Sequence, residues 1–270
     1  MELSPQQKRA LLAPVRCFLL DMDGTFYLGN QLLEGSLDFL SALDATGRTA
    51  CFLTNNSSKS ARVYDEKLAR MGVPERYRRV ITSGHAAAHY CLKTFPGKSA
   101  WVLGNDMLKE ELCAMGLRIS EEAPDYVLIA YDTTLDYAKM TRVCDLVRAG
   151  LPYIATHPDF NCPTETGFIP DCGSFCAAIS LSTGKQPKYL GKPFAETVEM
   201  VLDKTGFSAP EVAFVGDRLY TDVATGVKNG AVGLLVLTGE THLEDVPTSE
   251  VQPDAIFASL GEMGQQLCQL

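Results

Sequence analysis

The sequence has 270 residues, of which 46% are apolar and 21% charged, and its formal net charge is -9. This length fits either one large domain or a core domain that carries a smaller inserted one. The chain has 33 Asp and Glu residues but only 24 Lys and Arg. This acidic balance excludes sequence-blind binding to nucleic acid or to an anionic membrane surface, because such binding needs basic patches on the protein.

Short apolar runs alternate with longer amphipathic segments along the chain. The apolar runs lie at residues 15–20, 50–53, 101–103, 127–130, 153–155, 212–215 and 232–237. The segments between them include residues 36–45, 60–71, 136–147, 195–205 and 222–229, in which apolar residues recur every three to four positions as in helices. Strands that are apolar on both faces are typical of a parallel sheet covered by helices. We therefore predict an α/β protein whose chemistry lies beyond the carboxyl ends of its strands.

The first predicted strand ends in the sequence DMDGT at residues 21–25. Asp21 and Asp23 place two carboxylates at one strand end, beside a glycine that permits a tight turn. A plain surface turn is the alternative interpretation. A calcium-binding loop is excluded, because Phe26 and Leu32 occupy the positions where such a loop needs glycine and glutamate.

The second predicted strand ends in Thr54, which is followed by Asn55, Asn56 and two serines before a helix. Hydroxyls, amides and unpaired N–H groups at the start of a helix can bind a phosphate. Simple capping of the helix would also explain these residues. Their place at a second strand end makes Thr54, Asn55 and Asn56 candidate phosphate-binding residues.

Two further polar groups lie in the last third of the chain. Lys192 belongs to the sequence GKP just before a predicted helix, and Asp217 and Asp222 follow the strand at residues 212–215. Taken alone, such a lysine is usually a surface charge, and an acid such as Asp222 favours the start of a helix. Their recurrence near strand ends makes them candidates for the same site.

Together the four clusters match one chemistry. Asp21, Asp23 and Asp217 can supply the hard oxygen ligands that Mg²⁺ prefers. Thr54 and Lys192 can then stabilise the remaining oxygens of a phosphoryl group. The expected cofactor is Mg²⁺, and the expected partner is a small phosphorylated metabolite, with no nucleic acid and no membrane.

The motifs, in this order, resemble those of the haloacid dehalogenase (HAD) superfamily of phosphotransferases. DxDGT and the later GDxxx[ST]D carry a resemblance that covers essentially the whole chain. The sequences LTNNS at residues 53–57 and GKP at residues 191–193 are similar to the type IIA branch, which contains 4-nitrophenylphosphatases, phosphoglycolate phosphatase and pyridoxal phosphatase. The resemblance implies a Rossmann-like doubly wound parallel sheet core with an inserted α/β cap domain of the type that defines this branch.

The spacing of the motifs predicts where the cap is inserted. Only 28 residues separate Thr25 from Thr54, which is enough for one helix and one strand. Between Asn56 and Lys192 lie 135 residues, more than the core needs there. We therefore predict a catalytic core at residues 1–83 plus 189–270 and a cap at residues 84–188.

Two segments of the predicted cap are candidates for substrate selection. The strand near residue 153 runs into His157 and Asp159, and Cys172 lies at the start of a following helix. The resemblance implies that these segments hang over the catalytic site and help to select the leaving group. Simple turn roles for His157 and Asp159 are the alternative. The resemblance also leaves a homodimer formed through the cap open.

The resemblance implies a Mg²⁺-dependent phosphatase that hydrolyses small-molecule phosphate monoesters. Asp21 would be the nucleophile that forms an aspartyl-phosphate, and Asp23 the general acid and base, with its main-chain carbonyl as a metal ligand. Lys192 would neutralise charge on the phosphoryl group, and Asp222 would orient Lys192 or metal-bound water. The physiological substrate stays open among sugar phosphates, nucleotides, phosphoglycolate and pyridoxal phosphate.

Other functions of the same superfamily and of other classes fit the sequence less well. Asp23 counts against a dehalogenase, since a halide leaves without a proton, and a P-type pump needs membrane spans. A phosphomutase or other phosphotransferase uses the same acid pair, but its cap is usually inserted in the first gap. A non-catalytic phosphoacceptor or binding module, such as a receiver domain, is near half this length and carries its acceptor aspartate on an internal strand.

The nine cysteines are expected to be thiols. Their count is odd, no CxxC pair occurs, and several lie in apolar runs. The N-terminal region lacks the apolar stretch of a secretory signal, and no apolar run approaches the ~20 residues that span a bilayer. We therefore expect a soluble, cytoplasmic protein.

Overall fold

The computed structural model describes residues 3–164 and 166–270, which divide into two compact units. The first, called the core unit here, contains the described residues up to Thr54 together with Arg62–Ile81 and Lys192–Leu270. The second, called the inserted unit, contains Asn55–Ala61 and Thr82–Gly191. Each unit is built around its own parallel sheet.

The core unit is built on a six-stranded sheet with the order β15-β14-β13-β1-β4-β5. In that order the strands are Ala255–Phe257, Val232–Val236, Val212–Gly216, Cys17–Leu20, Thr49–Thr54 and Val80–Thr82. The register pairs Leu20 of β1 with Val215 of β13 on one side and with Phe52 of β4 on the other, both in parallel. Every residue of β1, β13 and β14 is buried, which fits strands covered on both faces.

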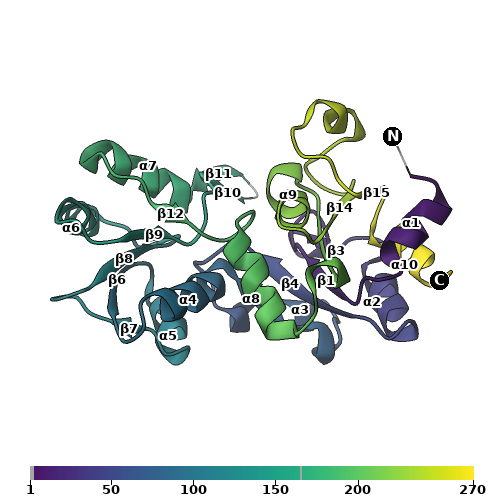
Figure 1. Ribbon diagram of the computed structural model, residues 1–270, viewed down its shortest axis with the longest axis horizontal. Coiled ribbons are helices and arrows are strands. Elements are labelled where there is room, and N and C mark those ends of the chain that lie inside the picture. Colours follow the sequence, from purple (N-terminus) through teal and green to yellow (C-terminus); the bar gives the residue numbers. More distant parts are fainter. Residues whose placement is uncertain (1–2, 165) are drawn as a thin grey trace. The chain divides into compact units, whose positions relative to one another are not determined.

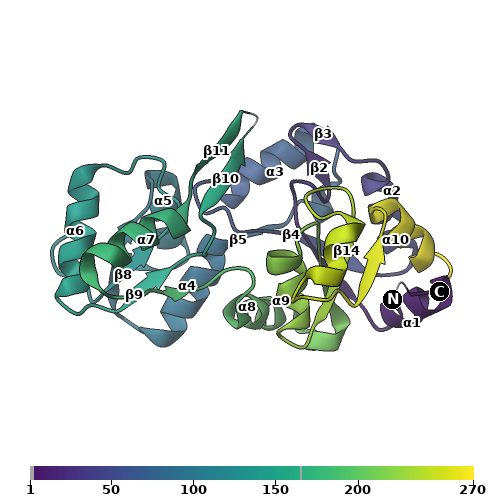
Figure 2. The same ribbon diagram turned by 90° about the horizontal axis from the view of Figure 1, so that it is seen from above.

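Helices flank this sheet on both sides, with α2 and α3 on one side and α8 and α9 on the other (Figure 2). The α-helices of the core unit are α1 (Pro5–Leu12), α2 (Ser36–Ala45), α3 (Ala61–Arg70), α8 (Ala195–Thr205), α9 (Ala224–Val227) and α10 (Leu260–Leu267). Short 3₁₀-helices span Glu75–Tyr77, Ala209–Glu211 and Leu243–Thr248. The predicted helices at residues 36–45 and 195–205 have the bounds of α2 and α8.

The predicted helix at residues 222–229 is wrong in its bounds, and its first two residues are π-helical rather than α-helical. A π-helical turn at Leu219–Val223 comes first, and the α-helix that continues it, α9, ends at Val227. Asp222 thus lies inside the π-helical turn, and such turns are frequently found at functional sites. A small antiparallel hairpin, β2 (Tyr27–Leu28) and β3 (Gln31–Leu32), follows the first motif and was not predicted.

The inserted unit has a second parallel sheet with the order β12-β9-β8-β6-β7 (Figure 1). Its strands are Lys188–Tyr189, Tyr153–Ala155, Tyr126–Ile129, Ser99–Leu103 and Arg118–Ile119. Helices α6 (Tyr137–Arg148) and α7 (Cys172–Thr183) pack on one face, whereas α4 (Ser83–Thr94) and α5 (Asp106–Ala114) pack on the other, each through its own apolar cluster. An antiparallel hairpin, β10 (Asn161–Thr164) and β11 (Gly167–Pro170), precedes α7.

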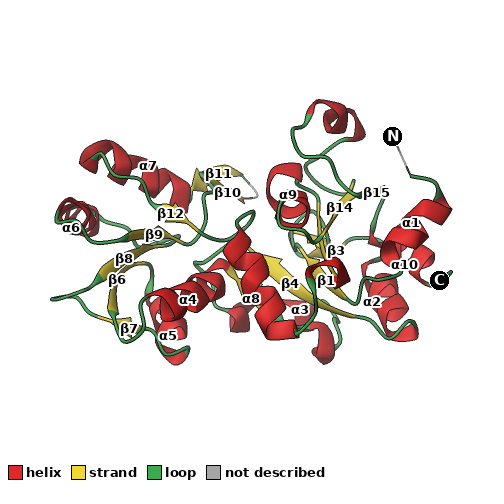
Figure 3. Ribbon diagram, viewed as in Figure 1, coloured by secondary structure: helices red, strands yellow, loops and turns green. Residues whose placement is uncertain are grey.

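These observations confirm the predicted fold class, a parallel α/β sheet core with flanking helices (Figure 3). The unit boundaries lie a few residues from the predicted ones, except that Asn55–Ala61, predicted as part of the core, groups with the inserted unit. The physical reason is hydrogen bonding: Tyr131 N donates to Ser57 Oγ at 3.0 Å, and Asn105 Nδ2 donates to Ser58 O at 2.8 Å.

All nine cysteines are free, and six of them are buried. The longest described helices have 12 residues, and none in the described part of the chain is long and apolar enough to cross a bilayer.

Candidate active site

Three of the predicted motifs meet at the carboxyl edge of the core sheet. Asp21 follows β1, Thr54 ends β4 and Asp217 follows β13, and these three strands are adjacent and parallel. The N–H group of Asp21 continues the ladder by donating to Val215 O of β13 at 2.8 Å. The sheet topology therefore brings the first acid pair next to the second, although 196 positions separate Asp21 from Asp217.

Lys192 is buried within this cluster of acids. Its Nζ lies 2.5 Å from Asp21 Oδ1, 2.5 Å from Asp222 Oδ1 and 3.2 Å from the carbonyl oxygen of Leu53. Burial disfavours the charged ammonium, but the two carboxylates outweigh it and hold the pKa of Lys192 above its ordinary value. Lys192 therefore supplies a fixed positive charge at the strand ends.

The carboxylates of Asp21, Asp217 and Asp222 gather around one point. One oxygen from each lies within 4.8 Å of the others, the one such group of ligands found in the described residues. Burial raises the pKa of Asp21 and Lys192 lowers it, and the charges of Asp222 and Asp217 bring it to about 7. Burial and the charge of Asp222 also raise the pKa of Asp217. Three carboxylates against one ammonium leave an excess of negative charge, which fits a site for a divalent cation with oxygen ligands.

Two glycines allow the backbone to approach Asp217. Gly24 has φ +84°, and a Cβ built on it would lie 2.5 Å from Asp217 Oδ2. A Cβ on Gly239 would also overlap the Asp217 side chain. The carboxylate accepts hydrogen bonds from Thr25 Oγ1 at 3.3 Å and from Glu240 N at 2.7 Å. The glycine of DxDGT thus has a steric role beside its turn, because any side chain there would displace an acid of the site.

The segment at residues 238–240 was missed by the sequence analysis. Glu240 N holds Asp217, and Thr238 Oγ1 donates to Gly24 O at 2.7 Å. A usable signal existed, since the sequence TGE follows the apolar run at residues 232–237 and so lies at another strand end.

Asp222 is held by its own turn. Gly216 leaves room for it, since a Cβ on this glycine would overlap the Asp222 side chain. Asp222 Oδ2 also accepts from Arg218 N at 3.3 Å. The predicted contact with Lys192 is present, and Asp222 is in addition placed to share a cation with Asp21 and Asp217.

Asp23 differs from the other three acids. Its side chain is exposed and does not belong to the described carboxylate cluster. The main chain around it is fixed by pairing with Tyr27, whose carbonyl accepts from Gly24 N at 2.8 Å. An exposed carboxylate on a fixed backbone can exchange protons with a substrate or with water. Its role as acid and base, and its carbonyl as a metal ligand, stay predictions.

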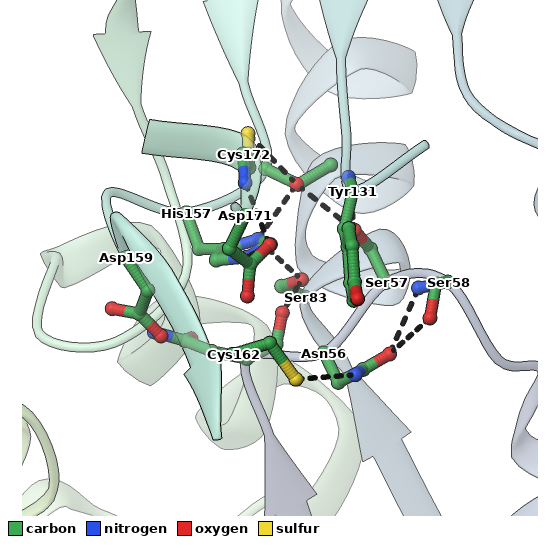
Figure 4. Close-up of polar contacts among 12 residues, drawn as sticks. Asn56, Ser57, Ser58, Ser83, Tyr131, His157, Asp159, Cys162, Asp171 and Cys172 are labelled. Atoms are coloured by element: carbon green, nitrogen blue, oxygen red, sulfur yellow. Dashed lines mark hydrogen bonds and ion pairs between the residues drawn. The ribbon is translucent and has the colours of Figure 1, made fainter. Parts of the chain in front are cut away.

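The predicted phosphate-binding asparagines belong to the inserted unit. Asn55 is buried and donates from Nδ2 to Asp159 Oδ2 at 3.1 Å. Asn56 is half-buried, and its Oδ1 accepts from both the N–H and the hydroxyl of Ser58 at 2.9 Å (Figure 4). These contacts order the turn that follows Thr54 in the chain.

The three residues of the inserted unit that are predicted to help select the leaving group differ in exposure, and their role stays a prediction. His157 and Cys172 are both 0% exposed, and their side chains hydrogen-bond inside the inserted unit, so any influence on the leaving group would act through neighbouring residues. Asp159 is half-buried and stays a candidate.

Comparison with known proteins agrees with this geometry. A model of the haloacid dehalogenase-like hydrolases matches residues 18–118, and a second, HAD-hydrolase-like model matches residues 189–263. An acid sugar phosphatase of Staphylococcus aureus is 36% identical over 248 residues, which is 92% of this chain and 96% of that protein. The chain belongs to the haloacid dehalogenase-like hydrolase family.

Solved structures of this family match both units of the chain. A 4-nitrophenylphosphatase from Thermotoga maritima is 46% identical and has a TM-score of 0.90. The match covers 94% of this chain and 98% of that protein. A glycerol phosphate phosphatase from Mycobacterium tuberculosis, crystallised in complex with magnesium, is 31% identical and has a TM-score of 0.87. The match covers 95% of this chain and 78% of that protein. These HAD relatives confirm the predicted type IIA branch and the predicted class, a hydrolase of the phosphatase type.

Proposed function

We propose that this HAD hydrolase is a Mg²⁺-dependent phosphatase that cleaves small phosphate monoesters through a phosphorylated Asp21. The observation that carries the proposal is the placement of Asp21. Its carboxylate lies at a strand end between the ammonium of Lys192 and the acids Asp217 and Asp222. A nucleophile, a fixed cation and a set of cation ligands are thus within one side-chain length of each other.

The donor set suits magnesium. Asp21 and Asp217, with Asp222 beside them and the main-chain carbonyl of Asp23 as the resemblance implies, would hold the ion through oxygen atoms only. When bound, Mg²⁺ supplies positive charge that polarises the phosphoryl oxygens. The presence of magnesium in the M. tuberculosis relative supports this choice of metal.

The reaction follows from the roles of the acids. A carboxylate oxygen of Asp21 forms a bond to phosphorus while the bond to the ester oxygen breaks, and Asp23 gives its proton to the departing alkoxide. Asp23, now a carboxylate, then removes a proton from water, whose oxygen attacks the aspartyl-phosphate. The bond from Asp21 to phosphorus breaks, and inorganic phosphate leaves with Asp21 restored.

Charge on the transferred group is neutralised by groups that do not react. Lys192 is fixed by Asp222 and by the carbonyl of Leu53, so it needs no reorganisation during the reaction. We assign Thr54, Asn55 and Asn56 to the phosphoryl oxygens, as their place after β4 predicts. Electrostatic stabilisation and positioning are the dominant requirements of phosphoryl transfer.

The relatives suggest where to look for the substrate. They are named for an acid sugar phosphatase, a 4-nitrophenylphosphatase and a glycerol phosphate phosphatase. Phosphates of sugars and of small polyols are therefore the first compounds to screen for this chain, with 4-nitrophenyl phosphate as the general reporter.

The test is hydrolysis of 4-nitrophenyl phosphate by the full chain. We expect EDTA to abolish turnover and Mg²⁺ to restore it, and we expect Asp21→Asn to reduce turnover to the background rate. Asp38→Asn, which changes an exposed acid on α2, is the matched control and should leave the rate unchanged. Metal-independent hydrolysis, or wild-type rates in Asp21→Asn, would overturn the proposal.

A further inference from the structure

The inserted unit contains a buried array of polar side chains around His157. Its members, called the His157 array here, are each at most 4% exposed: Ser57, Ser83, Thr156, His157 and Asp171. Figure 4 labels all of them except Thr156. They come from four separate segments of the chain. Burying so many polar groups is costly unless each is hydrogen-bonded, so the array must serve a defined geometry.

His157 is the centre of the array. Its Nε2 lies 2.9 Å from Asp171 Oδ1, and its Nδ1 lies 2.9 Å from Thr156 Oγ1 and 3.3 Å from Ser83 Oγ. Burial alone would lower the pKa of His157, but Cys172, Asp171 and Asp159 raise it to about 9. Asp171 is itself fixed, because its Oδ1 also accepts from Cys172 N at 2.6 Å.

The hydrogen-bond partners assign the protons of Ser83 and of Cys172. The Thr156 hydroxyl donates to Cys172 Sγ at 3.7 Å, and the Cys172 thiol donates to Ile129 O at 3.5 Å. Ser83 Oγ donates its one proton to the carbonyl oxygen of Asn55. Ser83 therefore has no proton left for Nδ1, and the direction of the shorter contact between Thr156 Oγ1 and Nδ1 is set by the tautomer of the imidazole.

The order Ser83, His157, Asp171 has the form of a catalytic triad, but the geometry does not support a nucleophilic serine. Ser83 is 1% exposed and His157 is 0% exposed, so no substrate can reach them. The serine hydroxyl points to the carbonyl of Asn55 rather than to the imidazole. A nucleophilic serine would instead donate its proton to the histidine.

The array is connected to the Asn55–Ala61 segment at two points. Ser83 holds the Asn55 carbonyl, and Thr156 Oγ1 lies 3.2 Å from Ser57 Oγ. Gly191 packs against the same place, since a Cβ on it would lie 2.6 Å from Thr156 O and 2.8 Å from Asn55 Oδ1. The conformation of Asn55 and Asn56 therefore depends on the side chains that His157 orients.

We propose that His157 is a positioning residue that, through Ser83 and Thr156, fixes the turn carrying the phosphate-binding asparagines Asn55 and Asn56. The inference rests on the proposed function only for the role of these asparagines. In this role His157 affects substrate binding although it does not contact the substrate.

Hydrogen exchange of the full chain, read by mass spectrometry on peptides covering residues 55–61, tests the positioning directly. A lost hydrogen bond of about 1 kcal/mol corresponds to roughly fivefold faster exchange. We expect exchange in these peptides to become faster by about this factor in Ser83→Ala and in His157→Gln. The amide of the glutamine takes the place of Nε2 but not of Nδ1. His157→Asn, whose amide replaces Nδ1, should keep exchange closer to wild type. Ser180→Ala, a buried serine of α7 outside the array, is the control and should leave these peptides unchanged.

Binding of inorganic phosphate tests the consequence for the site. The inhibition constant of phosphate against 4-nitrophenyl phosphate should rise several-fold in Ser83→Ala and His157→Gln, with a smaller rise in His157→Asn. Unchanged exchange in both Ser83→Ala and His157→Gln would overturn the inference, as would faster exchange with unchanged phosphate inhibition. Failure of the proposed function gives a different result, namely a wild-type chain that hydrolyses no phosphate ester.

Discussion

The ammonium of Lys192 lies 2.5 Å from Asp21 Oδ1 and makes an equally short contact with Asp222 Oδ1. One cation thus joins the proposed nucleophile to an acid 201 positions later in the chain. The contact keeps Asp21 oriented and offsets part of the repulsion among three neighbouring carboxylates. The same fixed charge is in place to stabilise a phosphoryl group bonded to Asp21 as negative charge develops there.

Replacing this cation should affect catalysis far more than an exposed lysine does. We expect Lys192→Met to lower kcat by ~100- to 1,000-fold, the usual effect of removing one preorganised donor. Lys228→Met changes an exposed lysine of the same unit and should stay within twofold of wild type. Steady-state kinetics with 4-nitrophenyl phosphate measure both, and equal effects in the two variants would contradict the assignment.

The steric role of Gly24 can be separated from its backbone conformation. Gly24 and Gly29 both have positive φ, at +84° and +59°, so alanine at either position carries strain of about 1–2 kcal/mol. Only the methyl group at position 24 would meet Asp217, because nothing lies within 4 Å of a Cβ at Gly29.

We therefore expect Gly24→Ala to raise the Mg²⁺ concentration for half-maximal activity by about tenfold or more, and Gly29→Ala to leave it unchanged. Thermal unfolding of both variants reports the shared strain. A similar Mg²⁺ requirement in the two variants would show that the close approach of Gly24 to Asp217 does not matter for the metal site.

The sequence was sufficient for the parts of the fold that depend on local pattern. The apolar runs predict β1, β4 and β13 within two residues, because buried parallel strands are continuous and end at polar turns. The short strand β5 and the hairpin β2–β3 were missed, since two or three residues carry no periodicity.

In the candidate site, too, the sequence predicts the features that depend on local pattern and not those that depend on long-range contacts. The acids of DxDGT and GDxxx[ST]D could be found because each motif is contiguous in the chain. The segment containing Glu240 could be placed at a strand end from the sequence, but its hydrogen bond to Asp217 could not, since a backbone N–H has no sequence signature. The surroundings of His157 could not be found from the sequence either, because its imidazole is buried among Asp171, Thr156 and Ser83 from separate segments. Long-range hydrogen bonding of this kind is decided by packing.

Asp23 should matter in proportion to the proton that the leaving group needs. Nitrophenolate is a good leaving group, whereas the alkoxide of a polyol phosphate must be protonated as it departs. We expect Asp23→Asn to reduce kcat/KM by ~10²- to 10⁴-fold for glycerol phosphate and by clearly less for 4-nitrophenyl phosphate. A set of phenyl phosphates whose leaving phenols differ in acidity measures how the loss of kcat/KM depends on the leaving group. Equal losses across the set would argue against acid catalysis by Asp23.

The buried ion pair of His157 and Asp171 should make the stability of the chain depend on pH. The groups that face the imidazole are Asp171, Cys172 and Asp159, and they raise its pKa from the ordinary 6.5 to about 9. A group whose pKa is higher in the folded state contributes its full stability below about pH 6.5, and this contribution is lost as the pH rises through about 9.

We expect the difference in unfolding free energy between wild type and His157→Gln to shrink by up to about 3 kcal/mol over this window, measured by denaturant titration at each pH. A His157→Gln difference that stays constant over the window would mean that the histidine is neutral in the fold.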